Sequence, residues 1–413
     1  MKKYARYQIA GMVGNILEHY DSALFGLLAP CLAPLFFQQD PLTALIMTYG
    51  IIPLGLITRP LGALFFGRIG DIYGRKQALS LSLLGMAVAT VGIGMLPTYN
   101  EVGCWAPIGL ACMRMLQSFC AAGESAGGAI FVLEHTDLQK RSIMSSLYDA
   151  STVSGILLAS ALVTIVSVMG KTECLWRGLF FAGAFTAVMG VIIRCSIDES
   201  HLLPVNKKNG IQTILRSHLK PFIAIVCCSG FGHITYSLAF VLMNGYIPLV
   251  TSLTQADVMQ INTYLLVIDM LALPCFGYIA SRVGKEKVMI TASLFSAICA
   301  IPLFQCLDQA SMATVVGVRL LLVTVGVAFA APYYAWAIDR VLPAHRYTVL
   351  SLGSALGSQL IGAPTSAVSL WLYQKTGWMG VPGAYLLVFG LLAAYAVWKT
   401  APQKTACAAV SAG

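Results

Sequence analysis

Eight ionisable side chains lie inside long apolar stretches of this sequence. They are Glu18, Asp21, Arg59, Arg114, Glu124, Asp149, Asp269 and Arg319. A charged side chain in the middle of a bilayer costs at least ~2.5 kcal/mol, so such residues are candidates for function. Buried carboxylates can take up and release protons, and an arginine can bind a carboxylate through its planar fork. These side chains could therefore bind protons and recognise ionic groups of a solute.

The spacing of these residues groups several of them. Glu18 and Asp21 are three residues apart and share a helix face. Gln117 and Glu124 are seven apart and share another. At 1.5 Å per residue, Glu18, Asp21 and Glu124 lie at similar depths, roughly 15–20 Å from the helix ends. We expect these three carboxylates to face one cavity, with Arg114 one to two turns away.

The composition indicates the solvent around these stretches. Hydrophobic residues make up 58% of the 413-residue chain and charged residues only 10%, whereas soluble domains carry about 25% charged residues. The net charge of +9 is scattered over short loops, which excludes a nucleic-acid partner and indicates membrane loops. The twelve cysteines show no CxxC pair and no metal-ligand spacing, so we expect neither a metal nor a cofactor.

Twelve stretches are long enough to cross a bilayer, which takes roughly 20 apolar residues. We expect an all-α integral membrane protein with spans at 8–37, 43–66, 77–97, 105–134, 142–169, 177–196, 219–250, 257–280, 287–306, 311–338, 347–374 and 380–399. The polar segment 197–218 lies in the middle of the chain. We interpret it as a cytoplasmic linker between two six-helix bundles, over residues 1–196 and 219–413.

The basic residues give the orientation. With the N-terminus inside, twenty of the 26 lysines and arginines fall in cytoplasmic segments, three fall outside and three lie within spans. The positive-inside rule then places both termini in the cytoplasm. We expect a multi-pass protein of a bacterial-type inner membrane that works in the bilayer as a monomer.

The two halves of the chain repeat each other. Three charged residues recur at an offset of 205: Arg114, Glu134 and Arg141 as Arg319, Asp339 and Arg346. Four loop residues recur at an offset of 210: Gly67, Asp71, Gly74 and Arg75 as Gly277, Ser281, Gly284 and Lys285. Six spans repeated in one orientation form a parallel repeat, related by a pseudo-two-fold axis along the membrane normal. Such halves can rock about a central cavity.

Four sequence stretches resemble the major facilitator superfamily. The segment "TRPLGALFFGRIGDIYGRK" is similar to its loop between spans two and three, in the metabolite:proton symporter branch. The stretches "GNILEHYD", "RMLQSFCAAGESAGGAIFVLE" and "WRGLFFAGA" resemble signatures of spans one, four and six of that branch. The branch includes permeases for α-ketoglutarate, citrate, shikimate and proline/betaine. The chain departs from it at His19, Ser118 and Ser281, which leaves the substrate open.

The resemblance gives the charged loop a role. It implies that Asp71 caps a helix N-terminus of the other half and that Arg75 pairs with acids at the base of the loop. A partly buried carboxylate at a helix N-terminus gains up to about 2 kcal/mol. Glu134 is a plausible partner of Arg75, and Ser281 lacks the matching carboxylate, so the two contacts should be unequal. We group as a cytoplasmic gate Gly67, Asp71, Gly74, Arg75, Lys76, Glu134, Arg141, Asp339 and Arg346; the alternative is that they are ordinary solvated anchor charges.

The buried charges divide into roles. We interpret Asp21 and Glu124 as proton-coupling candidates and Arg114, with Gln117 beside it, as a ligand of a substrate carboxylate. Glu18 is expected to be a partner of Arg114 or His19. The alternative is that Arg114 and Glu124 only neutralise each other or link two spans.

The remaining candidates lie on other spans. Asp149, in a stretch similar to that of the osmolyte permeases, could meet a proton or a quaternary ammonium, or serve as a gate residue. Asp269 and Arg319 could complete the cavity wall, whereas Arg59 is expected to be structural. Glu18 and His19 are also candidates for substrate contact, and weaker candidates are His233, Tyr236 and Asn244.

We therefore expect a secondary active transporter that takes up a small organic acid or zwitterionic osmolyte with H⁺, or with Na⁺, by alternating access. A proton-driven exporter of drugs, siderophores or metabolites is the alternative, and a solute sensor that does not transport is another. The sequence shows no nucleophile-and-base spacing, so we do not expect an enzyme.

Overall fold

The computed structural model of the chain describes residues 2–39, 47–48, 51, 54–169, 175–183, 211–308 and 310–401. Every regular element in those ranges is a helix. The first half forms α1 (Lys2–Phe36), α3 (Gly55–Ile72), α4 (Arg75–Met95), α5 (Tyr99–Val102), α6 (Trp105–Glu134), η2 (Leu138–Lys140) and α7 (Arg141–Val168). The second half forms α9 (Ile211–Ser217), α10 (Leu219–Tyr236), η3 (Ser237–Leu242), α11 (Met243–Val250), α12 (Gln255–Val283), α13 (Lys285–Gln305), α14 (Met312–Ala330), α15 (Tyr333–Ile338), η4 (Pro343–His345), α16 (Arg346–Leu356), η5 (Gly357–Gly362), α17 (Thr365–Thr376) and α18 (Val381–Lys399).

Helices are the expected result for such apolar segments, because a bilayer leaves no other partner for their backbone groups. Within the described ranges, eight helical segments are long and apolar enough to span a membrane: Arg75–Met95, Trp105–Glu134, Leu138–Val166, Leu219–Leu242, Gln260–Val283, Lys285–Gln305, Met312–Ile338 and Val381–Lys399. Three other predicted spans correspond to α1, to α3 and to α16 with η5 and α17. The predicted span 177–196 lies mostly outside the described residues, as does most of the predicted linker.

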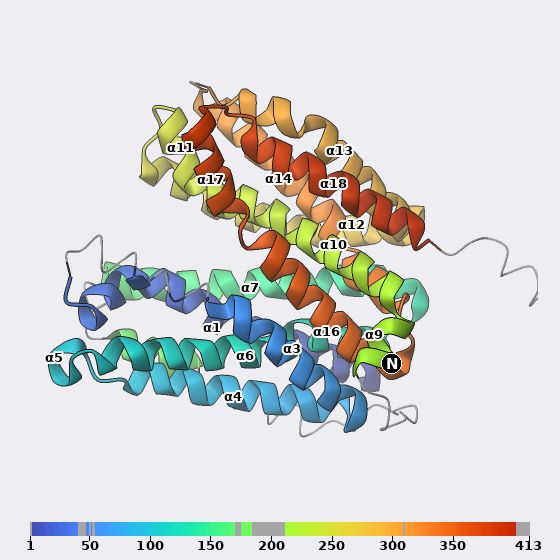
Figure 1. The fold of residues 1–413 in the computed structure, drawn as a ribbon, viewed down its shortest axis with the longest axis horizontal. Coiled ribbons are helices and arrows are strands. Elements are labelled where there is room, and N and C mark those ends of the chain that lie inside the picture. The colour runs from blue at the N-terminus through green and yellow to red at the C-terminus, as the bar shows by residue number, and fades with distance from the viewer. Residues whose placement is uncertain are drawn as a thin grey trace, which may run out of the picture.

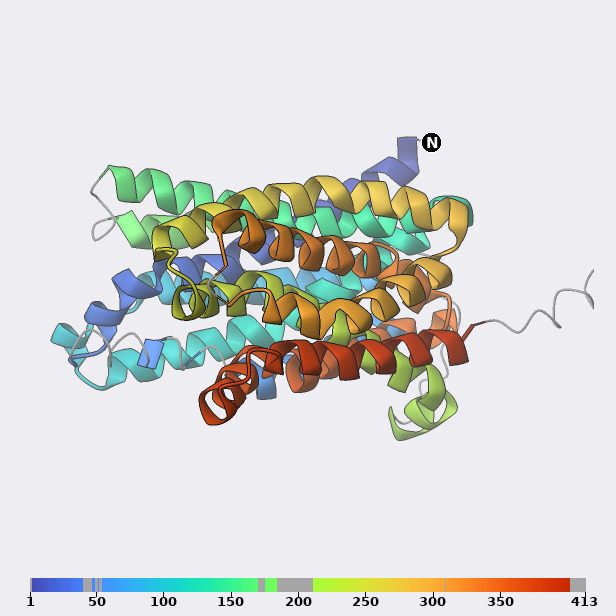
Figure 2. The same ribbon diagram turned by 90° about the horizontal axis from the view of Figure 1, so that it is seen from above.

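The long helices form two groups. In Figure 1, α1, α3, α4, α6 and α7 fill the lower part, and α10, α12, α13, α14 and α18 fill the upper part. Figure 2 shows the long helices of both groups running in roughly one common direction. Two seams join the groups: α7 packs against α12, and α3 packs against α16. We call these the α7/α12 seam and the α3/α16 seam.

Helix α3 is longer than the sequence suggested. The predicted span ended at residue 66, but the helix continues to Ile72 and carries Asp71 in its last turn. The chain turns at Gly74, whose φ of +123° favours a residue without a Cβ atom. The end of the molecule where α3 meets α4, called the Asp71 end below, lies at the right of Figure 1 together with α9 and the start of α1.

The glycines before that turn serve packing. A Cβ atom on Gly70 would lie 1.6 Å from the Tyr347 ring, and one on Gly67 would lie 2.9 Å from the Cα atom of Thr348. Small residues let two helix backbones approach closely in a membrane. The α3/α16 seam is therefore tight at the Asp71 end.

Two spans of the second half are not regular α-helices. The segments Ser237–Leu242 and Gly357–Gly362 are π-helical. Such segments widen a helix locally and are frequent at functional sites. Both of them contribute residues to the wall of the central cavity, among them Phe240 and Ser358.

Candidate substrate cavity

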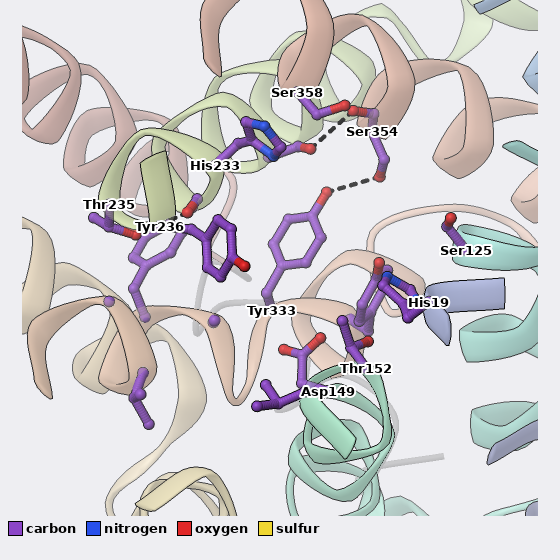
Figure 3. A pocket seen from close by; sticks show the side chains of 18 of the residues that line it. His19, Ser125, Asp149, Thr152, His233, Thr235, Tyr236, Tyr333, Ser354 and Ser358 are labelled. Atoms are coloured by element: carbon purple, nitrogen blue, oxygen red, sulfur yellow. Dashed lines mark hydrogen bonds between the residues drawn. The ribbon is translucent and has the colours of Figure 1, made fainter. Parts of the chain in front are cut away.

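A cavity of about 390 Å³ lies between the two groups of helices. Its wall takes polar residues from both groups: Glu18, His19, Arg59, Ser125, Asp149 and Thr152 from the first, and His233, Tyr236, Asp269, Tyr333, Tyr334 and Ser354 from the second. Figure 3 shows many of these side chains around the cavity. The volume lies within the range of small-molecule sites.

One wall of the cavity carries a compensated carboxylate. The fully buried Glu18 has Oε2 3.0 Å from Nδ1 of His19 and Oε1 3.4 Å from Nη2 of Arg59. Ser125 Oγ donates to Oε2 of Glu18 at 3.1 Å and accepts from Nη2 of Arg59 at 3.1 Å. The predicted contact of Glu18 with His19 is confirmed, and the alternative partner Arg114 is wrong. Arg59, which we expected to be structural, instead lines the cavity with its side chain 30% exposed.

A second wall carries Asp149 on α7. Asn15 on α1 fixes the face of α7 beside it, because its Nδ2 donates to the carbonyl of Tyr148 at 3.0 Å and to Ser151 Oγ at 2.7 Å. Asp149 then faces the cavity near Tyr333 (Figure 3). Among the described residues, no hydrogen bond or ion pair is made to the Asp149 carboxylate.

Asp269 on α12 lines the cavity from the other group of helices. Its carboxylate lies within electrostatic range of Asp149, and likewise makes no hydrogen bond or ion pair with a described residue. The predicted place of Asp269 on the cavity wall is confirmed. Tyrosine rings surround this region: Tyr333 contacts Tyr334 at 5.0 Å between ring centroids, and its hydroxyl lies 2.9 Å from Ser354 Oγ.

Asp21 and Arg114 form a separate cluster behind the cavity wall. Thr90 Oγ1 donates to Oδ2 of Asp21 at 3.1 Å and accepts from Nε2 of Gln117 at 3.0 Å. Arg114 donates to Gln117 and lies over the Phe25 ring, 4.3 Å from its centroid. Neither Asp21 nor Arg114 lines the cavity.

The expectation that three carboxylates face one cavity is therefore wrong. Of these three carboxylates, only that of Glu18 lines the cavity. Asp21 is 1% exposed in its own cluster, and Glu124 is fully buried in α6. The i, i+3 spacing puts two residues on one broad face, but that face touches more than one neighbour. Glu18 is directed at α3, and Asp21 at α4.

Arg319 has a structural position, contrary to our expectation. It is fully buried and donates to the carbonyls of Ala239 at 2.9 Å and Val258 at 3.3 Å, and to the side chain of Asn262. Ala239 belongs to the π-helical segment η3, so Arg319 supplies a donor where the regular helix pattern is broken. His233 and Tyr236 line the cavity as predicted. The side chain of Asn244 lies outside the described residues.

Asp71 bonds directly to the other half of the chain. Its Oδ1 accepts the backbone N–H of Tyr347 at 3.1 Å and its Oδ2 accepts that of Thr348 at 2.9 Å. Both N–H groups belong to the first turn of α16. The predicted cap on a helix of the other half is confirmed, and we call this contact the Asp71 cap.

Arg75 supports the Asp71 cap through contacts with Asp71 itself and with both halves of the chain. Its Nη1 donates to Oδ1 of Asp71 at 2.6 Å, and its Nε lies 3.3 Å from Oε2 of Glu134. Its Nη2 donates to the carbonyl of Pro343 in the other half at 2.8 Å. Glu134 also lies 3.5 Å from Nη1 of Arg346. The predicted Arg75–Glu134 pair is thus confirmed, and Lys76 follows it in the first turn of α4.

The repeat reproduces the ion pairs but not the cap. Asp339 pairs with Arg141 of the first half at 2.7 Å and with Lys285 of its own half. The hydroxyl of Ser281, however, donates to the carbonyl of Tyr278 in its own helix at 2.7 Å. The predicted inequality of the two contacts is confirmed.

Several cavity residues escaped the sequence analysis. Tyr333 and Tyr334 follow Pro332 inside an apolar stretch, and Ser354 lies in a glycine-rich helix. A hydroxyl inside a predicted span was the one available signal. It is a weak signal, because serine and threonine also bond back to their own helix.

These features define a membrane transporter with the major facilitator fold. The structure of the proton:xylose symporter XylE bound to 6-bromo-6-deoxy-D-glucose superposes with a TM-score of 0.79 over 97% of this chain and 96% of that one, at 16% identity. The structure of the transporter FucP in the outward conformation gives 0.75 over 96% and 100%, at 10% identity. This likeness confirms the predicted fold of two six-helix bundles.

The family model "Sugar (and other) transporter" matches residues 8–214, and the chain belongs to that family of the major facilitator superfamily. The glycine betaine/proline/ectoine/pipecolic acid transporter OusA of Dickeya dadantii is 27% identical over 97% of this chain and 85% of its own length. The proline/betaine transporter of Escherichia coli K12 has the same identity and coverage. The predicted resemblance to proline/betaine permeases is confirmed, and the chain is a multi-pass membrane transporter, not an enzyme.

Proposed function

We propose that this chain imports a small zwitterionic osmolyte of the betaine or proline type together with a proton. The observation that carries this proposal is the cavity between the two halves, whose wall holds both the basic Arg59 and the acidic Asp149 and Asp269. A solute with charges of both signs matches such a wall. The names of the relatives point to the same class of solute.

The orientation follows from the charges. We assign the Asp71 end to the cytoplasm, because the basic loops of the chain gather there and cytoplasmic loops carry the excess of lysine and arginine. Both termini then lie in the cytoplasm of a bacterial inner membrane. The halves 1–196 and 219–413 are the moving units, 197–218 links them, and one chain suffices because both walls of the cavity come from it.

The contacts between the halves support an outward-open state. The Asp71 cap, the Arg141–Asp339 pair and the Glu134–Arg346 pair all cross between the halves at the Asp71 end. Opening toward the cytoplasm must break these contacts. Alternating access then consists of exchanging them for contacts at the opposite end.

We place proton coupling in the Asp21 cluster. The Asp21 carboxylate is buried, accepts a hydrogen bond from Thr90, and is linked through Thr90 and Gln117 to Arg114. A carboxylate facing an arginine in an apolar setting can change its pairing when it takes up a proton. Glu124 and Asp149 are the alternative proton sites, and Na⁺ is the alternative ion.

Uptake into proteoliposomes tests the function. The panel is glycine betaine, proline, α-ketoglutarate, citrate and shikimate, each with and without an inward proton gradient at constant Na⁺. We expect gradient-driven accumulation of betaine or proline, lost in Asp21→Asn and retained in the exposed control Asp308→Asn. Accelerated loss of preloaded solute on imposing the gradient would show export, and accumulation that requires a Na⁺ gradient instead would show that the ion is not H⁺.

A further inference from the structure

We propose that Asp149 and Asp269 together hold the cationic end of the solute, between the rings of Tyr236 and Tyr333, while Arg59 and His19 receive its carboxylate. This inference rests on the proposed osmolyte transport and assigns the two ends of the ligand to residues. The solute class it selects is a quaternary or secondary ammonium joined to a carboxylate by a short linker.

The first argument is the absence of partners at the acidic end. Among the residues that the structure describes, neither Asp149 nor Asp269 has a hydrogen-bonding or ion-pair partner, although both face the cavity. Glu18, in contrast, is surrounded by His19, Arg59 and Ser125. A buried carboxylate is costly unless a positive charge or a hydrogen bond compensates it. His19, when protonated, lies within electrostatic range of Asp149 and offsets part of its charge. A solute cation between the two carboxylates would supply the rest of the compensation.

The second argument is the chemistry of the wall around these carboxylates. Tyr236, Tyr333 and Tyr334 line the same cavity, and Phe240 lies against Tyr236 with 5.1 Å between ring centroids. Aromatic faces bind quaternary ammonium groups through their negative ring centres. A methylated or ring-bound ammonium cannot donate several hydrogen bonds, so a wall of rings with two carboxylates suits it better than a hydrogen-bonding site.

The third argument is the part of the wall that carries Arg59 and His19. Nη2 of Arg59 bonds to Glu18 and Ser125, and the Arg59 side chain is 30% exposed. An arginine fork can bind a second carboxylate with its remaining N–H groups. His19, one of the residues at which this chain departs from the branch, lies beside it with a 19% exposed side chain. Because Glu18 already balances Arg59, this wall contributes hydrogen bonds more than net charge, and the acidic wall dominates recognition.

Three probes of similar size test this assignment. Glycine betaine carries both charges, choline carries the cation alone, and 3,3-dimethylbutyrate is the carbon isostere of betaine with only the carboxylate. Binding is measured by isothermal titration calorimetry on the full chain in nanodiscs, in sodium-free buffer. We expect betaine to bind, choline to compete with it, and 3,3-dimethylbutyrate not to compete.

Variants then locate the cation. We expect Asp149→Asn and Asp269→Asn each to weaken betaine and choline binding about tenfold or more, as for loss of a charge-assisted contact. Asp308→Asn is the matched control, and Asp269→Glu is expected to recover part of the affinity. The thermal unfolding of each variant identifies loss of fold, so that a folded variant without binding supports the assignment.

The opposing outcomes are distinct. Competition by 3,3-dimethylbutyrate as strong as that by choline overturns the assignment, as do unchanged affinities in both Asn variants or failure of wild type to bind betaine and choline. Displacement of choline by Na⁺ at equal stoichiometry would overturn it in favour of an inorganic cation site. If the expected binding pattern is seen without proton-driven uptake, the assignment stands and the proposed function is refuted. If both Asn variants take up solute as wild type does, the proposed function stands and the assignment is refuted.

Discussion

Replacing Asp71 by asparagine tests how strongly the Asp71 cap holds the two halves together. The substitution keeps the shape of the side chain and one carbonyl oxygen, but removes the charge and turns one acceptor into a donor. That donor then faces one of the two N–H groups, of Tyr347 and Thr348, which Asp71 accepts at 3.1 and 2.9 Å. Arg75 keeps Glu134 as an anion partner at 3.3 Å, so no buried cation is stranded.

The size of the effect follows from these contacts. A charged group near a helix N-terminus contributes up to about 2 kcal/mol when partly buried, and a hydrogen bond to a charged group about 1.5–3 kcal/mol. The two figures describe the same contact and overlap, so we take about 2–3 kcal/mol. If opening the Asp71 end breaks this contact, the population of the open state relative to the closed state is about 30- to 150-fold higher in Asp71→Asn than in wild type.

Hydrogen exchange reads this equilibrium at the capped groups. In nanodiscs, we expect the amides of Tyr347 and Thr348 to exchange faster in Asp71→Asn by about that factor, because exchange of a bonded amide needs local opening. Ser281→Ala is the matched control from the repeat, since the Ser281 hydroxyl donates to Tyr278 of its own helix. Equal exchange in Asp71→Asn and wild type, or an equal increase in Ser281→Ala, would refute the reasoning.

Three further predictions follow. Ser281→Asp should place a carboxylate near the start of α7 and slow exchange of the amides at 142–143 by about two- to fivefold, the usual worth of a charge at a helix N-terminus. Burial lowers the pKa of His345, at the Asp71 end, below its ordinary value of 6.5. The unfolded chain therefore binds more protons, and stability should fall as the pH drops below about 6.5; the melting temperature at pH 5 and 7 should differ less in His345→Gln. Arg319→Met should leave the Ala239 carbonyl without its donor and cost about 1–3 kcal/mol of stability, seen as a lower melting temperature with an unchanged KM for the solute.

The fold was predictable from local sequence signals, and the Asp71 cap from a local signal together with the family resemblance. Each apolar stretch of sufficient length predicts one membrane span, and the offset of 205 residues between the two charged triplets indicates the repeat. Asp71 is an acid in a basic loop, which the positive-inside rule does not explain, and the resemblance to the family implied its cap on the other half. The resemblance also implied that Arg75 pairs with acids, for which Glu134 was the candidate in the sequence.

The cavity wall was less predictable, because it depends on how helices are rotated against one another. The spacing of Glu18 and Asp21 gives their common face but not the neighbour that each one meets. Arg59 and Arg319 look alike in sequence, as single arginines in apolar spans. Arg59 lies on the cavity wall, whereas Arg319 donates to the backbone carbonyl of Ala239 in a π-helical segment. The sequence alone does not predict that π-helical segment.

The two seams between the halves differ in what holds them. At the α3/α16 seam the Asp71 carboxylate accepts hydrogen bonds from two backbone N–H groups and closes the Asp71 end. At the α7/α12 seam the corresponding position is Ser281, whose hydroxyl bonds to Tyr278 and, among the described residues, to nothing across the seam. The carboxylates contributed by the two helices, Asp149 and Asp269, line the cavity instead. Under the proposed assignment of the solute, a cation between them relieves their mutual repulsion. On the proposed function, the first seam biases the empty transporter toward the outward-open state, and the second responds to the solute. A ligand can shift such an equilibrium only through contacts that differ between the states, and a cation shared by Asp149 and Asp269 is a contact of that kind.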